Sequence, residues 1–346
     1  MNKTIKHLGI LDLLRGFAAL SVVCFHFTVA SSAGGALAKY FSPLLNTTFS
    51  WGYLGVEVFF VISGFIIPYS LVKTSYNTRD FFPYLTKRIA RICPSAYVLI
   101  GLTLIQWMVV DFFVHHDTKC LVAITGGQVV SNLLFIVPFT GHKWFNGVFW
   151  TLAVEFQFYV VIGLLFNAFF TNATVTRFVA LGAFCCGVHY LPGFPQESFF
   201  KYAGLFMQGG ATLLYFIKAF SLRQYLPCLA LFTVASSFMV VPIAGVFGLA
   251  TALAIAFIEF KHPVAAFFGR ISYSLYLTHF VVGSTAEFIL SRFYQPVSPA
   301  GNTLAIVLCI IAACIGAQIF YLLVEKPFLK WSKRLMSAPT PLKQHT

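Results

Sequence analysis

The sequence contains very few charged residues. Only 10% of its 346 residues are Asp, Glu, Lys or Arg, whereas a soluble domain carries about 25%. Acidic residues are the scarcest of these, with 10 Asp and Glu in the whole chain, while 59% of the residues are hydrophobic and 41 are Phe. Only helices and closed barrels can span a bilayer, and the apolar runs here have the length of helices. The composition therefore predicts an all-α, polytopic integral membrane protein.

The motifs of several enzyme classes are also missing. The sequence has no P-loop, no G-x-S-x-G and no H-E-x-x-H, which argues against an ATPase, a serine-hydrolase nucleophile and a zinc protease. It has no C-x-x-C pair and no His/Cys spacing of a zinc site, so we expect no bound metal. Most of the eight cysteines lie in apolar runs, where we expect buried, inert thiols.

The apolar runs predict about ten transmembrane helices, since one crossing needs about 20 apolar residues. The predicted spans are 9–30, 51–72, 94–114, 147–170, 174–191, 199–217, 225–241, 243–260, 265–290 and 302–324. The first run lacks a small-residue cleavage site and is interpreted as a retained span. Segment 115–146, apolar in its centre at 120–139, is interpreted as an interfacial or re-entrant helix. We expect a membrane domain over 1–335 and a disordered cytoplasmic tail over 336–346.

The basic residues orient these spans. The net charge of +13 would suggest nucleic acid as the partner of a soluble protein, but here the basic residues flank the apolar runs. With a cytoplasmic N-terminus, 18 of the 23 Lys and Arg residues lie in or beside cytoplasmic segments, as the positive-inside rule requires. With an odd number of spans, such as nine or eleven, the basic residues of the C-terminal half would no longer fall on the cytoplasmic side. We therefore expect both termini in the cytoplasm, and no nucleic-acid partner.

The first span carries three ionisable residues, Asp12, Arg15 and His26. Such residues are costly inside a membrane and indicate a functional site. Arg15 and His26 are eleven residues apart, which places them on one helix face with about 16 Å of axial rise between them, and Asp12 lies one turn before Arg15. A histidine shielded from water is a plausible general base. The alternative is a histidine that only bonds a neighbouring helix.

Two further segments carry polar groups that could take part in chemistry. Arg88 and Arg91 lie one turn apart, on one face, in the predicted cytoplasmic loop 73–95, where two guanidinium groups could clamp a phosphate. Topology-setting charge is the alternative interpretation. In the second span, Glu57 is an acid within an apolar run. The small residues Ser63 and Gly64 of the same span permit a close approach of another helix, or access of a ligand to the backbone.

The last candidates lie in the C-terminal two thirds of the chain. Glu155 is the second acid within an apolar run, and Tyr276 and His279 share one face of a hydroxyl-rich span. Glu325 ends the last span and could pair with Arg270 or with an arginine of segment 73–95. A simple interfacial ion pair accounts for Glu325 equally well.

The motifs, taken together and in order, resemble those of the membrane acyltransferase 3 family. The resemblance rests on LDLLRGFAALSVVCFH, GYLGVEVFFVISGF, KRIARICP, FWTLAVEFQFY, SYSLYLTHF and VEKP, which cover about residues 8 to 330. The family includes bacterial O-acetyltransferases of O-antigen and exopolysaccharide. Two motifs depart from the family pattern, because WTLAVE replaces W-S-L-S-V-E and Lys326 stands where an arginine is more usual.

The resemblance implies an activity and assigns residues to it. It implies transfer of an acyl group, usually acetyl, from acyl-coenzyme A (acetyl-CoA or another short acyl-CoA) to a hydroxyl of an envelope glycan or lipid-linked saccharide. It also implies a bacterial cytoplasmic (inner) membrane. Arg15 and His26 match the essential pair of the family, Arg88 and Arg91 match a required arginine pair, and Glu155 matches the motif acid.

A mechanism follows as a hypothesis. Phosphates of coenzyme A would bind Arg88, Arg91 and Arg15, and the extended pantetheine arm would bring the thioester to His26. His26 would then deprotonate the acceptor or carry the acyl group transiently. Glu155 could orient or recharge the histidine, or bind the acceptor. The alternative function is a transporter or flippase for a lipid-linked or anionic solute, which would use the same buried charges.

Overall fold

The computed structural model describes residues 9–29, 47–115, 123–294 and 298–337. Within these ranges the chain forms helices and loops and contains no β-strand, as expected for the predicted all-α class. A helix lies in each of the ten predicted spans: α1 (Gly9–Thr28), α3 (Gly55–Lys73), α4 (Phe81–Val110), α7 (Phe149–Phe170), α8 (Val175–Val188), α9 (Phe199–Phe216), α10 (Leu222–Met239), α11 (Pro242–Phe257), α12 (Pro263–Phe293) and α13 (Pro299–Phe320).

These helices differ in length and apolar character. In the described part of the chain, five helical segments are long and apolar enough to cross a membrane: Gly9–Thr28, Thr47–Lys73, Thr78–Phe113, Phe149–Phe170 and Ala300–Ser332. Helices α8 and α11 are apolar but shorter. The protein is thus a helical membrane protein, and the number of ten crossings stays a prediction.

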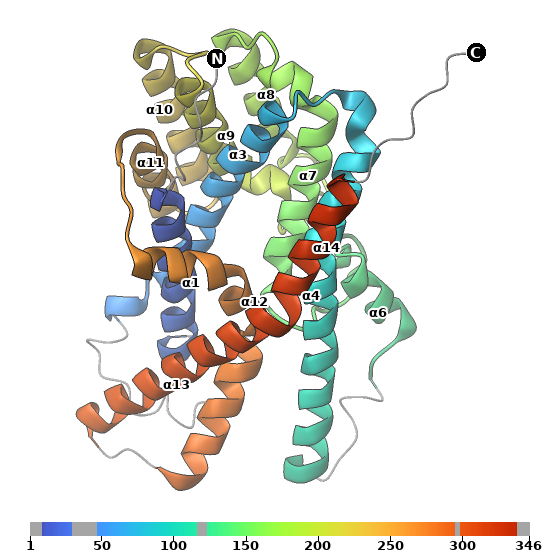
Figure 1. Ribbon diagram of the computed structural model, residues 1–346, viewed down its shortest axis with the longest axis vertical. Coiled ribbons are helices and arrows are strands. Elements are labelled where there is room, and N and C mark those ends of the chain that lie inside the picture. The colour runs from blue at the N-terminus through green and yellow to red at the C-terminus, as the bar shows by residue number, and fades with distance from the viewer. Residues whose placement is uncertain (1–8, 30–46, 116–122, 295–297, 338–346) are drawn as a thin grey trace.

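The two ends of the described chain lie toward the same end of the bundle (Figure 1). The first turn of α1 and the last turn of α14 (Lys326–Ser337) both point that way, and so does the start of α4. An even number of crossings would require this arrangement. Helix α14 reaches two residues into the predicted tail, and the rest of that tail lies outside the described residues.

Helix α4 begins earlier than the sequence predicted. The predicted span starts at residue 94, after a charged loop, but the helix runs from Phe81 and contains Pro94 in its interior. A proline usually ends a helix, yet membrane helices tolerate it where neighbouring groups satisfy the freed carbonyl. The interpretation of 73–95 as a loop was therefore wrong from residue 81 onward. Because of the longer helix, Arg88 and Arg91 are held on a rigid element.

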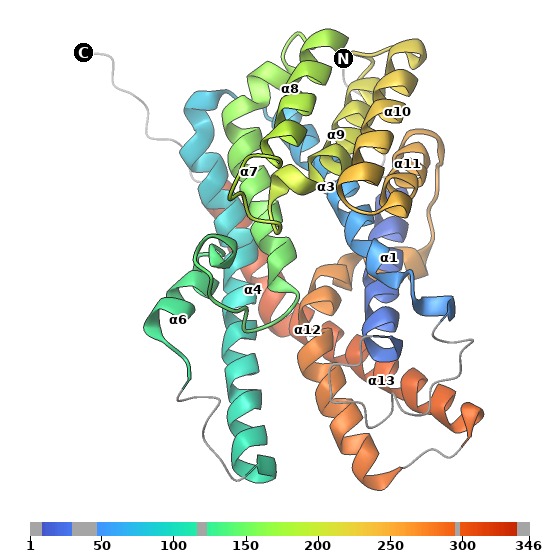
Figure 2. The ribbon, with the colours of Figure 1, turned by 180° about the vertical axis from the view of Figure 1, so that it is seen from behind.

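Close helix crossings build the centre of the bundle. Helix α1 packs between α12 and α3, and α3 packs on α9 (Figure 2). At the α3–α9 crossing, a Cβ atom on Gly64 would lie 2.2 Å from the carbonyl oxygen of Phe206, and one on Gly209 would lie 2.1 Å from that of Val61. Both positions thus admit only glycine, as in membrane helices that approach through small residues. The crossing sets the distance at which the neighbouring Ser63 faces α7.

The described part of segment 115–146 contains no helix long enough for an eleventh span. It forms the short helix α6 (Gly126–Leu133) and a 3-10 turn at Val137–Phe139. Thr125 caps α6 by accepting a hydrogen bond from the backbone N–H of Gln128. Of the cysteines, the seven that the structure describes are unpaired, and five of them are buried.

Candidate functional site

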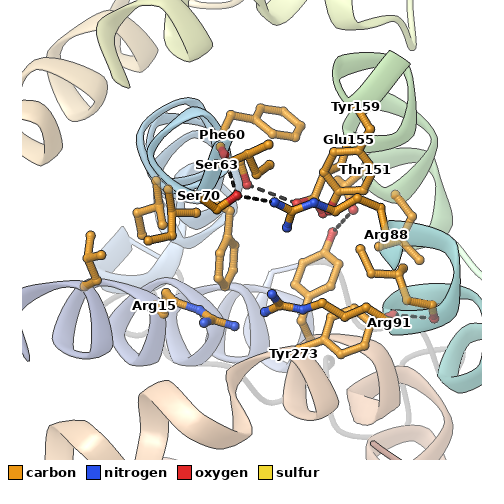
Figure 3. Close-up of a pocket in the computed structure, with 18 of the residues that line it drawn as sticks. Arg15, Phe60, Ser63, Ser70, Arg88, Arg91, Thr151, Glu155, Tyr159 and Tyr273 are labelled. Carbon is orange, nitrogen blue, oxygen red and sulfur yellow. Dashed lines mark hydrogen bonds between the residues drawn. The ribbon is translucent and has the colours of Figure 1, made fainter. Parts of the chain in front are cut away.

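A cavity of about 390 Å³ opens among α1, α3, α4, α7, α12 and the start of α14. Its lining brings together residues that lie up to about 300 positions apart in the sequence (Figure 3). Eight of the eleven site residues predicted from the sequence line it: Asp12, Arg15, Ser63, Arg88, Arg91, Glu155, Tyr276 and Glu325. The three others are His26, Glu57 and His279, which lie outside the lining.

The three arginines of the lining have different environments. Arg88 donates a hydrogen bond to the Ser70 hydroxyl at 2.6 Å. Its guanidinium also lies 5.5 Å from the ring centroids of Tyr84 and Tyr159, within the range of cation–π attraction. Arg88 is therefore fixed by a hydroxyl and two aromatic rings on one side of the cavity.

Arg15 and Arg91 face each other on another side. Their guanidinium groups point toward one another across the cavity (Figure 3), although Arg15 belongs to α1 and Arg91 to α4. Two like charges in a partly buried site repel, and an anion placed between them would be attracted by both. The sequence predicted a clamp of Arg88 and Arg91 on one helix face. The structure instead brings Arg91 opposite Arg15.

Two of the three acids of the lining, Glu155 and Glu325, accept hydrogen bonds from serines. The Ser63 hydroxyl donates to Glu155 Oε1 at 3.1 Å, and the Ser274 hydroxyl donates to Glu325 Oε2 at 2.5 Å. Glu325 is buried and lines the same cavity as Arg15 and Arg91. The expected partner Arg270 is oriented differently, since its guanidinium lies 5.7 Å from the ring centroid of Phe267.

His26 lies beside a second histidine instead of lining the cavity. The ring centroids of His26 and His279 are 5.1 Å apart. Tyr276 connects this pair to the cavity, because its ring centroid lies 6.0 Å from that of His279 and its hydroxyl bonds Thr151 Oγ1 in the cavity wall at 2.9 Å. The expected open path from Arg15 to His26 is therefore interrupted at Tyr276.

Glu57 is buried on α3, with 4% of its surface exposed. Its Oε2 atom has no hydrogen-bond partner among the residues that the structure describes. The next turn of α3, at Phe59 and Phe60, lines the cavity. No group of three or more His, Cys, Asp or Glu side chains in the described ranges could hold a metal ion.

Comparison with known proteins identifies the family. The acyltransferase domain model of acyltransferase 3 matches residues 8–322, which is most of the chain. The chain belongs to the acyltransferase 3 family. All cavity-lining residues except Glu325 and Leu329 fall within the matched range.

The individual relatives that match this chain are distant. It is 27% identical over 403 residues to the "Putative peptidoglycan O-acetyltransferase YrhL" of Bacillus subtilis (strain 168), covering 96% of this chain and 58% of that protein. It is 27% identical to the O-acetyltransferase OatA of Staphylococcus aureus over 46% of this chain and 25% of that protein. It is 28% identical to the O-acetyl transferase of Shigella phage Sf6 over 44% of each. The chain thus spans little more than half the length of YrhL. No solved structure matches it.

Two residues that contact Arg88 were not predicted as site residues, and of these Ser70 lines the cavity while Tyr84 does not. Ser70 and Tyr84 both contact Arg88, and neither was singled out from the sequence. Tyr84 lies four residues before Arg88, so helix periodicity could have indicated it. Ser70 comes from a different helix, and nothing in the sequence placed α3 beside α4 at that level.

Proposed function

We propose that this acyltransferase transfers a short acyl group, acetyl in the first instance, from acyl-CoA to a hydroxyl of a cell-envelope glycan or lipid-linked saccharide. The observation that supports this most directly is the cavity itself. It combines three arginines, a carboxylate and a neighbouring histidine pair in a helical membrane protein. Arginine side chains bind phosphates through charge-assisted hydrogen bonds, and a histidine can act as the general base that deprotonates a hydroxyl.

The arginine end is the proposed donor site. Guanidinium groups bind phosphates through paired hydrogen bonds, and Arg15 and Arg91 offer such groups from two sides (Figure 3). The same lining also contains apolar side chains, among them Ile62, Ile66 and Leu152, which suit a pantetheine arm. We place the nucleotide phosphates at Arg15 and Arg91, and we assign Arg88, which Ser70 and two tyrosine rings already hold, to the structure of the cavity wall.

The reaction centre lies at the other end, next to Tyr276. For a thioester to reach His26, it has to pass beyond the lining of the cavity at Tyr276, whose hydroxyl bonds Thr151. His26 would then take the proton of the acceptor hydroxyl or carry the acyl group transiently. Glu155, held by Ser63, would orient the reacting groups or bind the acceptor.

The identity of the acceptor and the membrane in which the protein resides are proposed from the names of the relatives. The printed names of the relatives describe O-acetyltransferases, one of them of peptidoglycan. An envelope glycan on the outer side of a bacterial cytoplasmic membrane fits those names. Both termini of the chain and the coenzyme A site would then lie on the cytoplasmic side, where most basic residues are expected.

The test measures acyl transfer from radiolabelled acetyl-CoA in membranes that contain the protein. We expect label in the envelope glycan and release of free coenzyme A thiol that depends on the acceptor. His26→Ala should abolish both, whereas Lys87→Ala, which removes a charge from α4 outside the lining, should abolish neither. Gradient-driven solute uptake without thioester consumption would identify a transporter and reject the proposal.

A further inference from the structure

His279 is a fully buried histidine with a defined hydrogen-bond pattern on one nitrogen. Its Nδ1 lies 2.8 Å from the carbonyl oxygen of Tyr276 and 3.3 Å from that of Leu275. A carbonyl oxygen only accepts hydrogen bonds, so Nδ1 must carry the proton. In the neutral ring this leaves the lone pair on Nε2.

The Nε2 atom of His279 makes no hydrogen bond to the described residues of the fold. It is buried and has no hydrogen-bond partner among the described residues, and the side chain is 0% exposed. A buried polar atom left without a partner costs about 1–3 kcal/mol, and such atoms are rare in folded proteins. Packing alone would be served better by an apolar residue, so the free nitrogen indicates a ligand.

A second unpartnered nitrogen lies close by. His26 Nδ1 is also buried without a partner in the described part of the chain, and the two imidazole centroids are 5.1 Å apart. Phe280 packs against both rings, with its centroid 4.4 Å from that of His26 and 4.8 Å from that of His279. One aromatic wall thus holds both imidazoles in place, beside Tyr276 at the end of the cavity.

We propose that His279, in place of His26, is the catalytic base, and that its Nε2 takes the proton of the acceptor hydroxyl. This inference rests on the proposed acyl transfer and assigns within it a role that His26 alone was expected to fill. The acceptor O–H bond breaks and its proton moves to His279 Nε2, while the oxygen attacks the thioester carbonyl. The C–S bond then breaks, the thiolate leaves as coenzyme A, and the proton passes from Nε2 to the sulfur. His26 Nδ1 is left to contact the reacting acyl group.

The test uses His279→Asn, because the asparagine amide can still donate to the Tyr276 carbonyl but has no group at the Nε2 position. His189→Asn serves as the control, since His189 lies on another part of the fold, at the end of α8. Both variants and the wild type are reconstituted in lipid vesicles. Binding of radiolabelled acetyl-CoA is measured first, followed by acetyl transfer to ethanol and to the more acidic trifluoroethanol.

We expect His279→Asn to bind acetyl-CoA as the wild type does and to lose about 10²–10⁴-fold in transfer, the usual contribution of a general base. The loss of transfer rate should be smaller for trifluoroethanol, because a more acidic alcohol depends less on a general base. Added imidazole should restore part of the transfer rate. His189→Asn should match the wild type throughout.

Two results would overturn the proposal. The first is a transfer rate of His279→Asn equal to that of the wild type, which would show that His279 serves only to donate the Nδ1 hydrogen bond. The second is equal loss with both alcohols and no rescue by imidazole. If His279→Asn does not fold, His279→Gln is measured instead, because its amide reaches the Nε2 position but cannot take a proton there, and full transfer by this variant would also overturn the proposal. A wild type that transfers no acetyl group to the envelope glycan in the membrane assay described above would instead reject the proposed function.

Discussion

At the scale of single residues, the site divides its arginines between two tasks. Arg88 is held by Ser70 and by two tyrosine rings, so its position is set before any ligand arrives. Arg15 and Arg91 face each other (Figure 3) and gain most from an anion between them. Stability and substrate binding should therefore depend on different arginines.

Replacing Arg91 by alanine should weaken donor binding without weakening the fold. A hydrogen bond to a charged group contributes about 1.5–3 kcal/mol, so the KM for acetyl-CoA should rise about tenfold to a hundredfold. The measurement is initial-rate kinetics with acetyl-CoA as the varied substrate. Lys87→Ala is the matched control on the same helix, and an unchanged KM in Arg91→Ala would contradict this assignment.

Replacing Arg88 by lysine should mainly affect stability. A lysine carries the same charge but cannot stack on the Tyr84 and Tyr159 rings while bonding Ser70. Loss of these contacts should cost about 2 kcal/mol, seen as a melting temperature lower by about 5 °C in detergent. If Arg88→Lys melts like the wild type but binds acetyl-CoA poorly, Arg88 belongs to the donor site instead.

At the scale of helices, the crossing of α3 and α9 decides the width of the cavity. Ser63 and Gly64 are neighbours on α3, with Ser63 in the cavity lining and Gly64 against α9. A shift of α3 by the width of a methyl group would move Ser63, Ile66 and Ser70 together. The fold and the site are therefore coupled at this crossing.

Gly64→Ala should destabilise the protein and lower its activity, because the added Cβ would lie 2.2 Å from a backbone oxygen of α9. Overpacking of this kind costs about 1–3 kcal/mol. Gly101→Ala is the control, since nothing lies within 4 Å of its added Cβ, and its melting temperature should not fall. Equal melting temperatures for the two variants would show that the α3–α9 crossing can relax.

At the scale of the whole molecule, the arginine end of the bundle also holds the start of α1 and the end of α14 (Figure 1). The proposed orientation places that end in the cytoplasm, where acyl-CoA is available. The histidine pair then lies farther along α1, about 16 Å from the level of Arg15 by the rise of the helix. The direction of transfer would run from inside to outside.

Cysteine labelling tests this orientation. In a background without native cysteines, Arg223→Cys, exposed in the first turn of α10, should react with a membrane-impermeant maleimide only after the cells are opened. Gln196→Cys, exposed between α8 and α9, should react in intact cells. The two positions flank α9, so labelling of both from one side would contradict the crossing of α9 and the ten-span topology.

The sequence by itself determined the class of the protein and most of its site residues. Scarce charge and long apolar runs can be accommodated only by membrane helices, and a charge in such a run is costly enough to mark a site without a structure. Arg15 and Glu155 were found in this way, whereas Arg91 was found from its spacing to Arg88 in a cytoplasmic segment, and the cavity gathers all three.

Only the tertiary structure decided which residues meet. Periodicity relates residues on one helix, so it paired Arg88 with Arg91 and Arg15 with His26. Partners across helices depend on crossings such as Gly64 on Gly209 and on a helix that continues through Pro94, which local patterns do not specify. Those crossings set Arg91 opposite Arg15 and His279 beside His26, and they put Tyr276 at the end of the cavity.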